Sequence, residues 1–140
     1  MVLAINDTKL DYNELLENLS FLDDWEERYG YILELGKKIP PFPDTYKTDI
    51  FQVKGCVSQV WLYPEMRDDK LFFKGGSDSQ LVQGLVAIIL IIYSGLSKIE
   101  IQNIDFQAKF TALGLSEQLT PQRSNGVFSM IQKIQDYAKH

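Results

Sequence analysis

The sequence contains a single cysteine, Cys56, which makes this residue the leading candidate for chemistry. Gly55 precedes it, and because glycine adopts backbone angles that other residues avoid, a turn here can present the next side chain at its tip. A cysteine reacts as its thiolate, an anion that Lys54, Ser58, Gln59 and nearby backbone N–H groups could each stabilise. Free cysteine is also among the most buried residue types and often packs as a small apolar side chain. These residue types therefore permit a reactive thiol or a structural one.

The partners that most catalytic or metal-binding cysteines need are missing from the sequence. A single cysteine excludes an internal disulfide, a C-x-x-C redox pair and a multi-cysteine metal site built from this chain alone. A cysteine hydrolase needs a base, usually histidine, and the one histidine is His140 at the chain end, where residues are commonly disordered. Runs of acidic residues such as Asp23 to Glu27 more often form solvated helix starts than catalytic acid/base pairs, so no such pair is nominated. A lone thiol is left with either no chemistry or exchange with sulfur supplied by another protein, which requires a thiolate but no base in the same chain.

Composition places the chain in the ordinary globular class. Its 140 residues, 45% of them hydrophobic and 24% charged, suit one domain, so a single domain over 1–140 is predicted. A net charge of -5 argues against the basic surface that nucleic acid requires. The N-terminus lacks the features of a signal peptide, and the apolar run from Leu85 to Tyr93 is shorter than the ~20 residues that span a bilayer. We therefore expect a cytoplasmic protein that binds neither nucleic acid nor membrane.

Capping signals and helical spacing predict two helices in the first part of the chain. Residues 11–14 carry an acceptor side chain followed by Glu three residues on, which indicates a helix over about residues 11–19. A second helix is predicted to start after Asp23 or Asp24 and to end at Gly36. The residues expected on its core face are Trp25, Tyr29, Ile32, Leu33 and Leu35.

The second half of the chain is predicted to be mainly helical. The segment from Leu81 to Ser94 is apolar nearly all round, which is typical of a helix buried on most sides, and Ser77 with Gln80 has the spacing of its cap. Further helices are predicted from Ser97 with Glu100, over about Phe106 to Leu113, and from Pro121 towards Lys139 with Val127, Met130, Ile131 and Ile134 on its inner face.

Between the helices the apolar period changes to two, which indicates strands. We predict strands over Ile50–Val53, Val57–Tyr63 and Lys70–Lys74, with Pro64–Asp69 as a turn. Residues 37–49 contain three prolines and are predicted to be an extended connector. The predicted fold class is therefore α+β, with N-terminal helices, a three-stranded antiparallel sheet, and a buried helix and C-terminal helices packed on the sheet.

Several short motifs follow one another along most of the chain. They are G-C-V-S-Q-V-W at 55–61, W-E-E-R-Y at 25–29, L-G at 35–36, G-S-D at 76–78, G-L at 84–85 and L-T-P-Q-R-S-N-G at 119–126. In this combination the sequence resembles the SufE/CsdE family, and the cysteine motif with the T-P-x-R-S segment is its most specific part.

The resemblance implies a SufE/IscU-like α+β fold and a role in sulfur transfer. Cys56 is then expected to take persulfide sulfur from a PLP-dependent cysteine desulfurase of the SufS/CsdA type, to stimulate that enzyme, and to pass the sulfur to an iron-sulfur scaffold such as SufBCD. PLP would belong to the desulfurase, so no cofactor or metal is expected on this chain, which would be an accessory carrier instead of a free-standing enzyme.

Residues around the thiol are expected to support the loop or the partner surface. Gly55, Ser58 and Gln59 belong to the cysteine motif, while Asp78 and Arg123 match polar positions of the other two motifs. Arg123 is the stronger candidate of these two, because a cation near a helix N-terminus opposes the helix dipole and so calls for another role. The alternative is a regulatory partner of a desulfurase that transfers no sulfur and in which Cys56 is merely packed.

Overall fold

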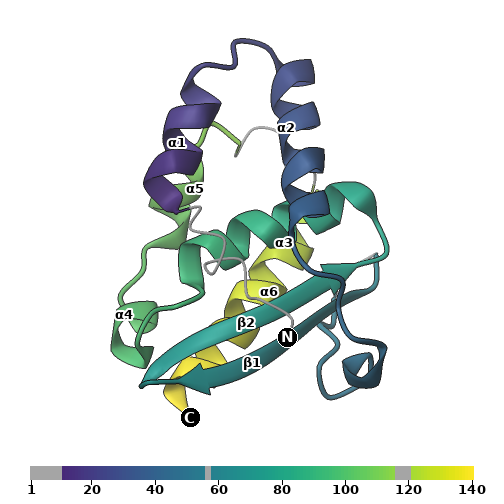
Figure 1. The fold of residues 1–140 in the computed structure, drawn as a ribbon, viewed down its shortest axis with the longest axis vertical. Helices are drawn as coiled ribbons and strands as arrows, with labels where there is room; N and C mark the ends of the chain where they lie inside the picture. The colour runs from purple at the N-terminus through teal and green to yellow at the C-terminus, as the bar shows by residue number, and fades with distance from the viewer. Residues whose placement is uncertain (1–10, 56–57, 116–120) are drawn as a thin grey trace.

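A computed structural model describes residues 11–55, 58–115 and 121–140 of the chain, without the side chains of residues 121–124. The fold is α+β, as predicted. An antiparallel pair of strands crosses one side of the molecule, helix α3 (Gln80–Tyr93) lies against it, and helix α6 (Pro121–Lys139) passes behind it (Figure 1). The hairpin of α1 (Tyr12–Ser20) and α2 (Trp25–Lys38) projects from the far side of α3 (Figure 1).

The sheet in the described residues is a β-hairpin with a tight turn. Strand β1 (Val60–Arg67) pairs with β2 (Lys70–Ser77), and the turn residues Asp68 and Asp69 have φ of 53° and 64°, the left-handed geometry that tight hairpins favour. The predicted turn over Pro64–Asp69 was therefore too long, because Pro64 lies inside β1 opposite Phe73. Proline is tolerated there because this position of the ladder points its nitrogen away from β2.

The predicted third strand, Ile50–Val53, is wrong for the residues described. This segment makes one bridge, Gln52 to Trp61, with the hydrogen bonds Val53 N to Val60 O and Leu62 N to Phe51 O, both 2.8 Å. The chain turns just before the bridge, since the amides of residues 51 and 52 both donate to Thr48 O, and turns again at Lys54–Gly55. The segment thus runs beside β1 too briefly to form a strand.

Helices α1 and α2 begin where their capping residues predict. The side chain of Asp11 accepts from Glu14 N at 2.9 Å, and that of Asp24 accepts from Glu27 N at 2.8 Å. The predicted end of α2 at Gly36 is wrong, because the helix continues to Lys38. A Cβ on Gly36 would lie 2.8 Å from the backbone nitrogen of Gly84 in α3, so this glycine serves the close crossing of the two helices.

The apolar face predicted for α2 is only partly buried. Ile32 and Leu35 are fully buried, whereas Trp25 is half-buried and 37% of Tyr29 is exposed. The prediction of a core position for Tyr29 is therefore wrong. Its ring packs edge-on against Trp25, with centroids 6.0 Å apart, on the outer part of the hairpin.

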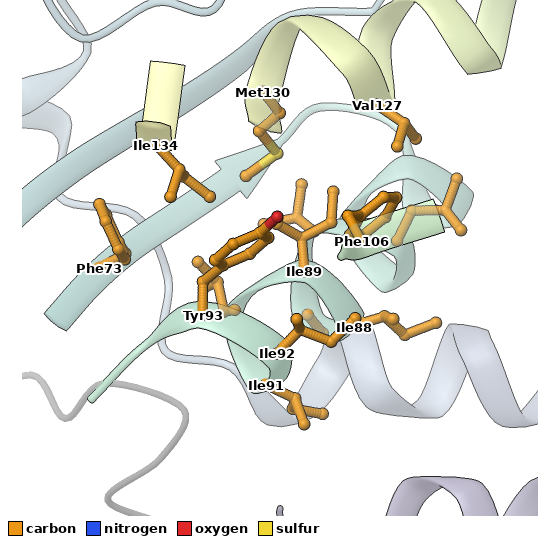
Figure 2. Close-up of a cluster of buried hydrophobic side chains, with 14 of the residues drawn as sticks. Phe73, Ile88, Ile89, Ile91, Ile92, Tyr93, Phe106, Val127, Met130 and Ile134 are labelled. Carbon is orange, nitrogen blue, oxygen red and sulfur yellow. The ribbon is translucent and has the colours of Figure 1, made fainter. Parts of the chain in front are cut away.

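Helix α3 is the centre of the core, as its apolar sequence predicts. Its cap differs from the prediction, because the side chain of Ser79 accepts from Val82 N, while Ser77 accepts from Ser79 N instead of capping the helix. Figure 2 shows the side chains packed around the second half of α3, which come from α3 itself, β2, α5 (Phe106–Ala112) and α6: Ile88, Ile89, Ile92, Tyr93, Phe73, Phe106, Val127, Met130 and Ile134.

The remaining helices agree with the prediction. Ser97 and Glu100 form a capping box at α4 (Lys98–Gln102), and α5 begins after Asp105. On α6 the predicted inner residues are buried, except that Ile131 is only partly so, and the predicted cap Thr120 lies outside the described residues. The connector predicted over 37–49 begins later than expected, because Lys37 and Lys38 belong to α2, and the remaining residues contain a short 3-10 helix, η2 (Asp44–Tyr46). None of the described helices has both the length and the apolar content needed to cross a bilayer.

Candidate functional site

The candidate thiol, Cys56, lies with Val57 outside the described residues, so the site is built from the chain on either side of it. On the near side Gly55 has φ +85°, a backbone conformation that strongly favours glycine. On the far side Ser58 is half-buried and Gln59 is exposed, and β1 begins just after them at Val60. We call residues 50–55 the entry segment.

The entry segment lies between β1 and α6. Phe51 and Val53 bond to β1, as described above. On its other side, Lys133 Nζ of α6 donates to Ile50 O at 2.8 Å and to Gln52 O at 3.0 Å. Burial, and to a lesser extent the nearby charge of Lys54, lowers the pKa of Lys133 below its ordinary value. The segment that leads to Cys56 is therefore held from both sides.

The chain beyond Cys56 is held by a reciprocal pair that we call the exit pair, Gln59 and Asp78. Gln59 N donates to the Asp78 carboxylate at 3.0 Å, and Asp78 N donates to Gln59 O at 3.3 Å. Asp78 immediately precedes the cap of α3, so the exit pair connects the cysteine motif to the N-terminus of the most buried helix. The structure thus gives Asp78 a contact within the chain, whereas the sequence suggested a place on a partner surface.

Lys54, which the sequence suggested could stabilise a thiolate, contacts residues that precede it in the chain. Its ammonium donates to the Gln52 side chain at 3.0 Å and lies 3.7 Å from the Asp49 carboxylate. Both Lys54 and Asp49 are largely exposed, so this ion pair contributes little to stability. In the sequence, Lys54 is two positions before Cys56.

Two surface grooves lie beside the described parts of the motif. The first, of about 690 Å³, lies on the exit side and is lined by the exit pair, by Phe42 stacked on Trp61, and by Lys47 over the Trp61 ring at 5.3 Å. The second, of about 750 Å³, lies between the entry segment and α6. Its rim carries two exposed apolar side chains, Ile50 and Phe128, at 74% and 52% exposure.

Metal binding finds no support in the described part of the chain, where no group of three or more His, Cys, Asp and Glu side chains is close enough to share an ion. Arg123 belongs to the first turn of α6, but its side chain is outside the description. The expectation that Arg123 lies near the thiol therefore stays a prediction.

Sequence reasoning missed two residues that contact the entry segment. Lys133 and Ser129 lie one turn apart on α6, and a Cβ on Gly55 would come 3.0 Å from Ser129 Oγ. The signal available was weak, because a polar pair four residues apart on a helix is ordinary for a solvent-facing surface. Only the fold shows that this face meets residues 50–55.

The fold and the site define a class of small α+β protein whose lone cysteine follows a segment held between a sheet and a helix. In fold the chain is similar to a hypothetical protein from Thermus thermophilus known from its solution structure, with a TM-score of 0.74 and 19% identity, covering 91% of this chain and 93% of that one.

The sequence comparisons identify the family of the chain. The SufE family model, described as an Fe-S metabolism associated domain, matches residues 13–138. An uncharacterised SufE-like protein of Rhizobium meliloti is 44% identical over 136 residues, covering 94% of this chain and 96% of the relative. Another from Rhizobium etli is 43% identical over 131 residues, covering 91% and 88%. The chain therefore belongs to the SufE family, which confirms the resemblance seen in its motifs, and is associated with iron-sulfur metabolism.

Proposed function

We propose that this chain is a sulfur acceptor and carrier that works with a PLP-dependent cysteine desulfurase of the SufS/CsdA type. Cys56 takes the persulfide sulfur, the chain stimulates the desulfurase, and the sulfur passes to an iron-sulfur scaffold of the SufBCD type. Membership of the SufE family supports the link to iron-sulfur metabolism. The observation that carries the proposal furthest is that the only thiol lies between an entry segment and an exit pair that each bond to a separate part of the fold.

The transfer is a thiol exchange that needs no oxidant. The Cys56 thiolate attacks the outer sulfur of the persulfide on the desulfurase, a new S–S bond forms on Cys56, and the old S–S bond breaks. The desulfurase cysteine leaves as a thiolate and takes up the proton that Cys56 released. One sulfur atom has then moved between proteins with no net oxidation. PLP stays on the desulfurase, where it supplies the chemistry that frees sulfur from cysteine.

The surface around Cys56 is the proposed docking site for the desulfurase, with Arg123 in the first turn of α6 as a contributor. An arginine there could steady the anionic sulfur or pair with a carboxylate on the partner. The second candidate function, a regulator that transfers no sulfur, would use the same proposed docking site but would give the thiol no chemical role.

Replacement of Cys56 by serine separates the two functions. Because a hydroxyl cannot form a persulfide, Cys56→Ser should accept no sulfur from a desulfurase supplied with cysteine, while its melting temperature stays close to that of the parent. Sulfur acceptance, desulfurase turnover and thermal unfolding are measured on both proteins. Stimulation of the desulfurase by the serine variant at the parent's level would contradict the acceptor role and favour the regulator.

A further inference from the structure

The entry segment bonds to β1 on one side and to a side chain of α6, Lys133, on the other. Phe51 and Val53 point towards β1 and bond to it. Residues 50 and 51 lie in a turn, and the carbonyls of Ile50 and Gln52 both accept from Lys133 Nζ. Lys133 therefore satisfies two backbone acceptors of the segment that do not bond to β1.

Lys133 is bound more firmly than a typical surface lysine, because its ammonium is partly buried and bonds two backbone carbonyls. The ammonium bonds two backbone carbonyls at 2.8 and 3.0 Å, and hydrogen bonds that involve a charged group are stronger than neutral ones. These contacts join residues more than 80 positions apart in the sequence. Ser129, one turn earlier on the same helix, lies against Gly55, so α6 follows the segment as far as the residue before the thiol.

We propose that Lys133 is a positioning residue for sulfur transfer: it holds the entry segment between α6 and β1 and so fixes where the chain presents Cys56. This inference rests on the proposed sulfur-acceptor function. Two backbone hydrogen bonds and the packing of Phe51 on Tyr63 join the entry segment to β1, and we expect the loss of Lys133 to let the segment open more often while the core stays folded. Cys56 would then reach the reacting geometry in a smaller fraction of encounters with the partner.

The test compares three substitutions on α6. Lys133→Met keeps an unbranched side chain of similar length but removes the donors, Lys133→Arg restores donors, and Lys139→Met removes an exposed lysine of the same helix as the matched control. Hydrogen exchange is followed at the Val53 amide, which bonds Val60 O, and at the Leu71 amide, which bonds Leu96 O away from the segment.

In Lys133→Met we expect exchange at Val53 to become about tenfold faster, or more, with Leu71 unchanged. The rate constant for persulfide formation on Cys56 at saturating desulfurase should fall about tenfold, while the half-saturating desulfurase concentration changes little. Lys133→Arg should recover most of both losses, and Lys139→Met should match the parent.

Three results would overturn the positioning role. These are unchanged Val53 exchange in Lys133→Met, equal acceleration at Val53 and Leu71, which would mean a general loss of stability, and faster Val53 exchange with unimpaired transfer. If the parent itself accepts no sulfur, the proposed function fails separately, and the exchange data, which need no partner, still decide whether Lys133 holds the segment.

Discussion

Asp78 shows how a residue recognised by its motif can have a different contact from the one its motif suggests. The sequence placed it on a partner surface near a helix N-terminus, where a carboxylate is favourable by ~0.3 to 1 kcal/mol without any partner. In the structure its carboxylate accepts a hydrogen bond from the Gln59 amide, so Asp78 holds the residues that follow Cys56 in the chain. A contact with a partner is compatible with that task but is not needed to explain the residue.

Substitution of Asp78 should loosen the exit from the cysteine motif. Asp78→Ala removes the acceptor of Gln59 N, which we expect to lower the free energy of unfolding by about 1 kcal/mol and to speed hydrogen exchange at the Gln59 amide. Asp78→Asn keeps an acceptor oxygen and serves as the matched control. Urea unfolding and amide exchange measure the effects. An alanine variant that matches the parent in both would show that the exit pair does not hold the chain.

Tyr93 is a buried phenol whose hydroxyl has no hydrogen-bond partner, and it lies among apolar side chains in Figure 2. Burial raises its pKa to about 12, and a weaker interaction with the Gln135 side chain, which does not have the geometry of a hydrogen bond, opposes that rise. An unfolded tyrosine ionises at about pH 10. Between these two values the unfolded chain has lost a proton that the folded chain keeps, so the contribution of Tyr93 to stability falls as the pH rises.

We therefore expect Tyr93→Phe to be at least as stable as the parent at pH 7, because no hydrogen bond is lost, and to lose less stability between about pH 10 and 12. Tyr12→Phe is the control, since the Tyr12 hydroxyl donates to Lys109 O at 2.7 Å and its loss should lower the free energy of unfolding by about 1 kcal/mol at pH 7. Urea unfolding at several pH values decides the matter. A steeper alkaline loss in Tyr93→Phe would contradict this account.

Among the helices and strands, those with local signals could be predicted from the sequence. The starts of α1, α2 and α4 follow from Asp11, Asp24 and Ser97, because each capping side chain and the backbone amide that donates to it are only three residues apart. The burial of α3 follows from its composition. Errors arose where distant residues decide the outcome. Helix α2 continues past Gly36, where it crosses α3 closely. Residues 50–53 make one bridge to β1 and bond to Lys133, and they do not form the predicted strand.

The candidate site divides in the same way. Cys56 and Gly55 could be picked out from the sequence because one is the only thiol and the other is its flexible neighbour. Lys133 and the bond from Gln59 to Asp78 could not, because the first joins residues more than 80 positions apart and the second 19. Contacts of this kind come from the packing of elements, which a period or a motif does not encode.

The crossing of α2 and α3 offers a test with a control in the same helix. At Gly36 a Cβ would lie 2.8 Å from Gly84 N, so Gly36→Ala must push the helices apart and should lower the free energy of unfolding by about 1 to 3 kcal/mol. At Gly30 a Cβ would meet nothing within 4 Å, so Gly30→Ala should raise that free energy by about 0.5 to 1 kcal/mol. Urea unfolding compares the variants, and equal effects at the two glycines would contradict the close crossing.

At the scale of the whole molecule, three elements converge on the cysteine motif. Helix α6 and strand β1 hold the chain before Cys56, and the start of α3 holds the chain after it. One surface groove borders the exit pair, and the other borders the entry segment. The elements that form the core therefore also hold the described residues on either side of Cys56, which suits the proposed role of a carrier whose sulfur must meet a partner in one orientation.

The most direct test of the account is to locate the transferred sulfur. The chain is mixed with a SufS/CsdA-type desulfurase and cysteine, free thiols and persulfides are trapped by alkylation, and intact and peptide mass spectrometry map any added sulfur. We predict one added sulfur atom on the peptide that contains Cys56, and none on the Cys56→Ser variant. A desulfurase that carries its own persulfide and is stimulated by the chain, while Cys56 gains no sulfur, would contradict the account.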